Sequence, residues 1–115
     1  MKLFFLIIFK TFLILTILAG CATTEEIKET DPVALLNQGA ALLEEGQYDL
    51  SINCFNKAIE INPRFAEAYN NRAVAYFYKR DYEKAWDDVY KSQNLGYKVH
   101  PRFLNVLRQA SGREK

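Results

Sequence analysis

The chain has 115 residues, enough for one small domain. Lysine and arginine total 15 against 14 aspartates and glutamates, and the first twenty residues contribute only Lys2 and Lys10 to these counts. The rest of the chain is therefore close to neutral, which excludes the strongly basic surface on which nucleic-acid binding depends. With two cysteines, Cys21 and Cys54, and a single histidine, His100, the composition predicts neither a disulfide framework nor a metal site.

The first eighteen residues read MKLFFLIIFKTFLILTIL and are apolar apart from two lysines and two threonines. An early positive charge, an apolar stretch over residues 11–18 and the small residues Ala19 and Gly20 are typical of a secretory signal peptide. Lys10 interrupts the apolar run, whereas a membrane-spanning helix needs about 20 apolar residues without a central charge. Residues 1–20 are therefore predicted to be a cleaved signal peptide.

This segment ends in Leu18-Ala19-Gly20-Cys21, which resembles the lipobox of bacterial lipoproteins, an aliphatic residue and two small residues before a cysteine. The resemblance implies that the Cys21 thiol receives a diacylglyceryl group, that the chain is cleaved before it, and that the new amine is acylated. Several acyl chains give stable anchoring where one chain would not. We expect no other cofactor. The alternative is ordinary cleavage after Gly20, which would leave Cys21 as a free thiol.

Ala22 follows this cysteine, at a position where an aspartate in the lipoprotein family favours retention in the inner membrane. The resemblance therefore implies a protein of the bacterial cell envelope, lipid-anchored to the outer membrane and facing the periplasm. The inner membrane and the cell surface remain open alternatives. Residues 21–31 have no hydrophobic periodicity beyond the cysteine, and we interpret them as the lipidated residue and a flexible tether.

Asp31 and Pro32 are typical of a helix start, with aspartate as the N-cap and proline at the first helical position. From this point the sequence repeats with a period of 34 residues. Large apolar positions recur in the pairs Leu35 and Tyr69, Leu42 and Tyr76, Tyr48 and Tyr82, Ile52 and Trp86, Phe55 and Val89, and Ile61 and Leu95. Small positions recur in the pairs Gly39 and Ala73, Ser51 and Ala85, and Ala58 and Ser92.

The apolar residues within each repeat are spaced three and four apart, which predicts two amphipathic helices per repeat. We expect helices over residues 33–45, 48–61, 66–79 and 82–95. Gly46 is expected to end the first of them in a left-handed backbone conformation.

The 34-residue period with this alternation of large and small residues resembles the tetratricopeptide-repeat (TPR) family. The signature residues are Gly39, Gly46, Tyr48, Phe55, Ala58 and Pro63 in the first repeat, and Tyr69, Ala73, Tyr76, Tyr82 and Ala85 in the second. The resemblance implies an all-α fold, a short right-handed superhelix of two repeats over residues 32–65 and 66–99. Residues 100–115 would form a C-terminal capping helix and tail.

The capping helix is expected over residues 101–110, after Gly96 ends the previous helix. Its apolar side would consist of Phe103, Val106 and Leu107, and its outer side of Arg102, Arg108 and Gln109. We expect the apolar side to cover the open end of the second repeat. At the other end, Leu35 and Leu43 of the first helix would have no such cover, which leaves a second copy of the chain as one candidate for this face.

The resemblance implies that a partner binds on the inner face of the superhelix, built mainly by the first helix of each repeat. The candidate contact residues are Leu36, Ala40, Leu43, Glu67, Asn70, Asn71, Val74, Phe77 and Tyr78. For Leu36, Leu43 and Phe77 the alternative is that they belong to the core, because so short an array has little interior.

The expected function is that of a membrane-anchored TPR lipoprotein, a protein–protein interaction adaptor or scaffold in the cell envelope. A pilotin-like assembly factor for a pilus or secretin complex is the alternative. The sequence shows no paired acids, no nucleophile with a base and no glycine-rich phosphate loop, so we do not expect an enzyme. His100 is expected in an exposed turn, and Cys54 as a small buried side chain.

Overall fold

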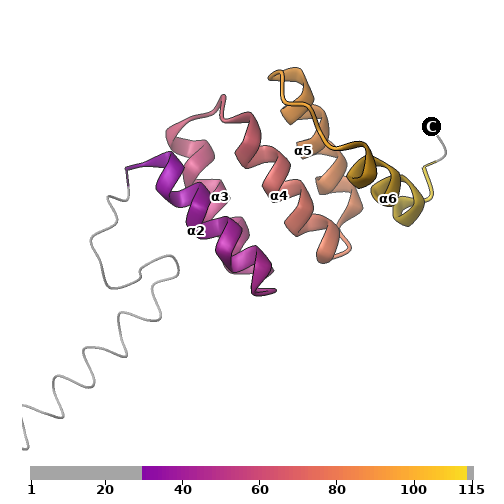
Figure 1. Cartoon of the computed structure of the whole chain (residues 1–115), viewed down its shortest axis with the longest axis horizontal. Coiled ribbons are helices and arrows are strands. Elements are labelled where there is room, and N and C mark those ends of the chain that lie inside the picture. Colours follow the sequence, from indigo (N-terminus) through magenta and orange to yellow (C-terminus); the bar gives the residue numbers. More distant parts are fainter. Residues whose placement is uncertain (1–29, 114–115) are drawn as a thin grey trace, which may run out of the picture.

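The computed structural model describes residues 30–113 and shows five α-helices and no strand in that range (Figure 1). The helices are α2 (Pro32–Glu44), α3 (Tyr48–Ile61), α4 (Ala66–Tyr78), α5 (Tyr82–Asn94) and α6 (Pro101–Ser111). Every boundary lies within one residue of the one predicted from the periodicity. The all-α prediction is confirmed for these residues.

The ends of the helices follow from local backbone chemistry. The Asp31 carboxylate accepts a hydrogen bond from the Val33 amide at 2.9 Å, which caps α2 as predicted. Gly46 has a φ of 78°, and the Gln47 amide donates to the Leu42 carbonyl at 2.9 Å, so the predicted left-handed end of α2 is confirmed. His100 is exposed and has a local role, because its Nδ1 accepts from the Arg102 amide at 3.1 Å and caps α6.

The helices form a row of antiparallel hairpins (Figure 1). Helix α2 pairs with α3, and α4 pairs with α5. Helix α4 also packs against α3, and α6 packs against α5 at the C-terminal end of the row. Helices α2 and α4, the first helices of the two hairpins, contact each other directly.

The first core lies between α2, α3 and the adjoining side of α4. Its buried residues are Leu35, Leu36, Ile52, Phe55, Ala58, Ala68 and Ala75. Leu35 is only 1% exposed, which corrects the expectation that it forms an uncovered face of the first helix. The prediction fails because Leu35 turns toward the first core instead of away from the array.

The second core lies between α4, α5 and α6. Its buried residues are Ala73, Ala85, Trp86, Val89, Val99 and Leu107. Helix α6 covers the second repeat as predicted, but Val106 is 36% exposed, and Leu104 takes part in the packing together with Phe103. The apolar face of α6 is therefore rotated relative to the expected one.

This rotation has a cause in the sequence. Ala68 and Ala75 are fully buried where α4 stacks on α3. The residues 34 positions later are Arg102 and Gln109, which are both exposed. Burying a charge and an amide without partners would cost several kcal/mol, so α6 cannot stack on α5 through the face that α4 uses.

Cys54 is fully buried on α3, as expected for a small side chain beside Phe55. It is disulfide-bonded in the structure, and the expectation that two cysteines do not form a framework of several bridges is unaffected.

The predicted signal peptide, Cys21 and most of the tether lie outside the described residues, so those predictions are not tested by the fold. Within residues 30–113, no helix has the length and apolar character needed to cross a membrane. In the same range, no group of three or more histidine, cysteine or acidic side chains is arranged to hold a metal ion.

Candidate functional site

The predicted inner-face residues lie on α2 and α4, but they are not equally accessible. Leu36 is 6% exposed and belongs to the first core. Leu43 is half-buried and packs against that core, and Phe77 is half-buried and packs against the second. Leu36 is therefore a core residue and not a contact residue. Leu43 and Phe77 also use much of their side-chain surface in core packing.

The remaining candidates form the accessible part of the inner face. Glu67 and Tyr78 are exposed, and the half-buried members are Ala40, Asn70, Asn71 and Val74. Asn70 donates from Nδ2 to Asn71 Oδ1 at 3.5 Å, while its own Oδ1 is buried without a hydrogen-bond partner among the described residues. A buried amide oxygen in this state costs about 1–3 kcal/mol.

Aromatic rings lie at the C-terminal end of α4, next to this surface. Tyr78 is 54% exposed, and its ring stacks on Tyr48 with centroids 5.2 Å apart and planes 5° from parallel. The Phe77 ring also meets Tyr78 edge-on at 5.5 Å, and Phe77 in turn meets Phe103 edge-on at 5.8 Å. Four rings from three helices are thus linked by successive aromatic contacts.

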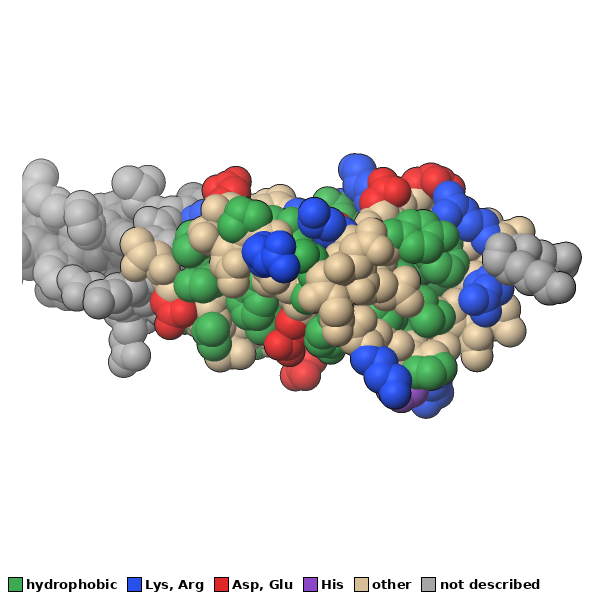
Figure 2. Space-filling model, turned by 90° about the horizontal axis from the view of Figure 1, so that it is seen from above, with side chains coloured by type: hydrophobic (Ala, Val, Ile, Leu, Met, Phe, Trp, Pro, Cys, Tyr) green, Lys and Arg blue, Asp and Glu red, His purple; other side chains and the backbone are tan. Residues whose placement is uncertain are grey.

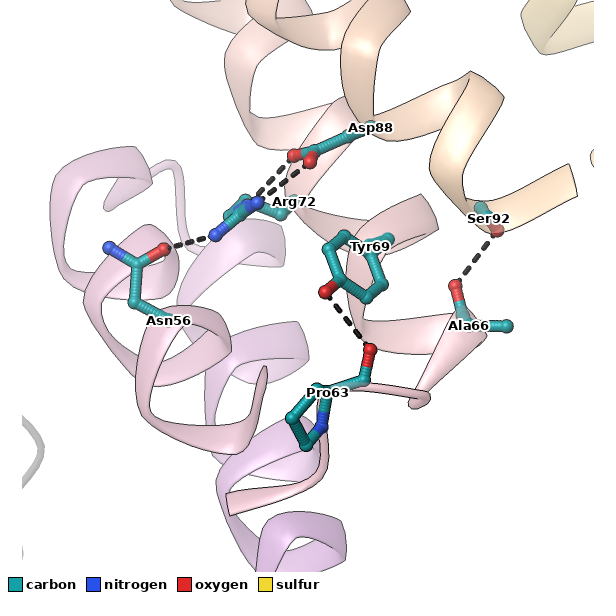
Figure 3. A network of polar contacts seen from close by, with 7 residues as sticks. All are labelled: Asn56, Pro63, Ala66, Tyr69, Arg72, Asp88 and Ser92. Carbon is teal, nitrogen blue, oxygen red and sulfur yellow. Dashed lines mark hydrogen bonds and ion pairs between the residues drawn. The ribbon is translucent and has the colours of Figure 1, made fainter. Parts of the chain in front are cut away.

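A polar network joins α3, α4 and α5 behind this face (Figure 3). Arg72 on α4 donates from Nε and Nη2 to the two carboxylate oxygens of Asp88 on α5, at 2.8 and 2.7 Å. Its Nη1 donates to Asn56 Oδ1 on α3 at 2.6 Å. One guanidinium therefore ties three helices together, and the bidentate geometry is the strongest form of such a pair.

Two further hydrogen bonds in the same view link side chains to helix ends (Figure 3). The Tyr69 hydroxyl donates to the Pro63 carbonyl at 3.0 Å, and the Ser92 hydroxyl donates to the Ala66 carbonyl at 2.8 Å. The first bond ties the α3–α4 connection to α4, and the second joins α5 to the first residue of α4.

The Arg72–Asp88 pair is largely removed from water, with side-chain exposures of 19% and 7%. Burial raises the pKa of Asp88 above its ordinary value, and the hydrogen bonds and charge of Arg72 offset only part of that rise. Burial lowers the pKa of Arg72, but the hydrogen bonds and charge of Asp88 outweigh it, so the pKa is raised overall. Arg72 also lies over the Tyr69 ring, 5.5 Å from its centroid.

Sequence reasoning missed this network. Arg72 occupies a repeat position at which the other two copies have the uncharged residues Gln38 and Val106. A charged residue at this position could have indicated a buried ion pair. Its partner, Asp88, lies 16 residues away, and only the packing of α4 on α5 brings them together. We interpret the network as structural support for the inner face, because it has little surface of its own.

Comparisons with known proteins agree with the repeat pattern. Residues 39–79, which contain the end of α2, all of α3 and all of α4, match a family model described as TPR repeat. Tetratricopeptide repeat protein 36 of Caenorhabditis elegans is 43% identical over 61 residues, which make up 53% of this chain and 34% of that protein. Its homolog in Nematostella vectensis is 37% identical over 60 residues, 52% of this chain and 33% of that protein.

A third relative is more distant. Intraflagellar transport protein 70A1 of Mus musculus is 29% identical over 85 residues, 74% of this chain but 13% of that protein. The chain spans about a third of the length of the first two relatives. The family model and the names of these relatives support the TPR resemblance of the helical array, and with it a role in protein–protein interaction. All three relatives come from animals, so they carry no information on the lipobox.

Proposed function

We propose that the chain is a membrane-anchored TPR lipoprotein that acts as a protein–protein interaction adaptor in the bacterial cell envelope. The observation that carries the proposal is the pairing of two TPR-like hairpins with an inner face that is still partly open. Repeat arrays of this kind use their concave surface for binding. The lipobox-like Leu18-Ala19-Gly20-Cys21 would supply the anchor.

The inner face suits a peptide or helix of a partner protein. Tyr78 offers an exposed ring, Glu67 an exposed charge, and Asn70 and Asn71 half-buried amides. An apolar surface beside a few polar groups is the usual composition of a peptide-binding groove. No group of side chains among the described residues points instead to a chemical reaction.

The binding surface is tested by placing a photo-crosslinking residue at single positions in cells. Probes at Tyr78 and Asn71 should give a discrete adduct with a partner protein. Matched probes at Asn53 and Glu60, which are exposed on α3, should not. Adducts from the α3 positions alone would place the interaction elsewhere. Loss of a client multimer when the chain is deleted would instead favour the pilotin-like alternative.

The anchor is tested separately. Cys21→Ser should abolish incorporation of radioactive fatty acid and move the protein from the membrane pellet to the soluble fraction. Cys54→Ala is the matched control and should retain the label. Continued labelling of the Cys21→Ser protein would contradict the lipobox interpretation.

The mass of the purified mature protein gives this test a second readout. A lipidated Cys21 adds acyl mass that reductant does not remove. A mature protein without that mass would refute the anchor.

A further inference from the structure

A groove of about 170 Å³ lies between α5 and α6, at the C-terminal end of the molecule. It is lined by Trp86, Tyr90, Gln93, Leu104, Arg108 and Arg113. None of these residues belongs to the predicted inner face. The groove is therefore a second surface, which the proposed adaptor function does not use.

The apolar wall of this groove is preformed. The Trp86 and Tyr90 rings stack with centroids 5.5 Å apart and planes 24° from parallel. The Trp86 indole N–H donates to Ser111 Oγ at 3.0 Å, which holds the ring against the end of α6. Tyr90 remains 50% exposed. A fixed aromatic surface binds without the cost of ordering its own side chains.

The polar residues of the groove carry positive charge. Arg108 and Arg113 line it, and none of the six lining residues is acidic. Arg113 is paired with Glu83 at 2.6 Å at the groove's edge, so its charge is partly neutralised. Arg108 donates to the neutral Asn105 Oδ1 at 3.1 Å and forms no salt bridge within residues 30–113. The guanidinium of Arg108 is the group best placed to receive an anion.

We propose that this groove binds an acidic peptide segment of a partner protein in which a carboxylate lies next to a large apolar side chain. The apolar side chain would pack on the exposed Tyr90 ring, which is held in place by the largely buried Trp86, while the carboxylate pairs with Arg108. Glu83 and Asp87 expose carboxylates on the same helix as the aromatic wall, which disfavours an extended anionic lipid surface. Figure 2 shows hydrophobic side chains flanked by both basic and acidic side chains at this end of the molecule.

Trp86 is the chain's single tryptophan, so its fluorescence reports directly on the groove. The full-length protein, purified in detergent, is titrated with an acetylated and amidated peptide of alternating leucine and glutamate. The emission should change saturably, and the same peptide with glutamine in place of glutamate should bind much more weakly. Arg108→Gln should weaken binding of the acidic peptide by about tenfold or more, because it removes a charge-assisted hydrogen bond.

Arg102→Gln is the matched control, since Arg102 is exposed on the same helix outside the groove. It should leave the affinity unchanged, and far-ultraviolet circular dichroism should confirm that both variants keep their helix content. The proposal is overturned by three results. One is the absence of a saturable change, another is equal binding of the glutamine peptide, and the third is an equal loss in Arg102→Gln. An Arg108-dependent response to phosphatidylglycerol vesicles but not to the peptide would show that the ligand is a membrane.

Discussion

The two repeats place different side chains at the same contact between their paired helices. In the first repeat, Gly39 on α2 faces the ring of Phe55 on α3, and a Cβ built on Gly39 would lie 2.5 Å from the ring. In the second repeat, the residues 34 positions later are Ala73 and Val89, both fully buried. A glycine with a large ring is thus replaced by a methyl group with a smaller side chain. The repeats preserve the volume at this contact and not the identity of its residues.

A second pair of positions differs in charge. The first repeat has Gln38 and the fully buried Cys54, whereas the second has Arg72 and Asp88. The first repeat is neutral at this place, although Gln38 Oε1 is buried without a partner among the described residues. The second repeat buries an ion pair and satisfies it with Asn56 from the first repeat. The Arg72–Asp88 pair therefore also connects the two hairpins, through Asn56.

The largest expected effect comes from breaking the ion pair. Arg72→Met should lower the free energy of unfolding by about 3–5 kcal/mol, because it leaves the Asp88 carboxylate buried without its partner. The double variant Arg72→Met/Asp88→Leu should recover most of that loss, since it removes both charges. Urea denaturation of the single and double variants measures the difference. A double variant as unstable as Arg72→Met would show that Arg72 matters through packing.

The same variant has a pH dependence with a definite sign. Burial already raises the pKa of Asp88, and removal of Arg72 should raise it further. A carboxyl whose pKa is higher in the folded state than in the unfolded state binds protons preferentially in the folded state. The stability deficit of Arg72→Met should therefore shrink as the pH falls from about 7 toward about 5. A deficit that stays constant over this range would contradict a buried ionised Asp88.

The next effect tests how α6 closes the second repeat. Leu107→Ala should cost about 2–5 kcal/mol, because Leu107 is fully buried and its removal leaves a cavity. Val106→Ala should cost much less, since Val106 is 36% exposed. Thermal unfolding of the two variants compares adjacent residues on one helix. Equal losses would show that α6 packs with the face expected from the sequence and not with the rotated one.

A smaller effect tests the exchange of volume between the repeats. Gly39→Ala should cost about 1–3 kcal/mol, because the new methyl group meets the Phe55 ring. Adding Phe55→Val recreates the pair found in the second repeat and should recover part of this loss. Phe55→Val alone is the control, and it should be destabilising through the cavity it opens. If the two single losses simply add in the double variant, the positions are not in direct contact.

The sequence predicts most of the fold but only part of the candidate site. Helix boundaries, the Asp31 cap and the Gly46 turn depend on local spacing and backbone chemistry, which one chain displays directly. The face that α6 buries was predicted only in part, with Phe103 and Leu107 correct and Val106 wrong, because it depends on how α6 packs against α5. The same applies to Arg72 and Asp88 and to the α5–α6 groove, whose residues come together only through packing. Leu36 shows most clearly what residue spacing cannot decide, since its position on α2 fits both the core and the inner face, and only the structure shows that it is buried.

The smallest expected effect concerns the turn between the paired helices. Gly46 ends α2 with a φ of 78°, and the corresponding residue after α4 is Arg80, with a φ of 63°. A left-handed conformation costs a residue with a side chain about 1–2 kcal/mol, whereas glycine adopts it freely. Part of that gain is lost because glycine increases the freedom of the unfolded chain by about 0.4–1 kcal/mol. Arg80→Gly should therefore raise the free energy of unfolding by up to about 1 kcal/mol. The reverse exchange, Gly46→Arg, should lower it, and thermal unfolding of both variants measures the two shifts. If Arg80→Gly is no more stable than the parent, the side chain of Arg80 must contribute enough in the folded state to offset its backbone strain.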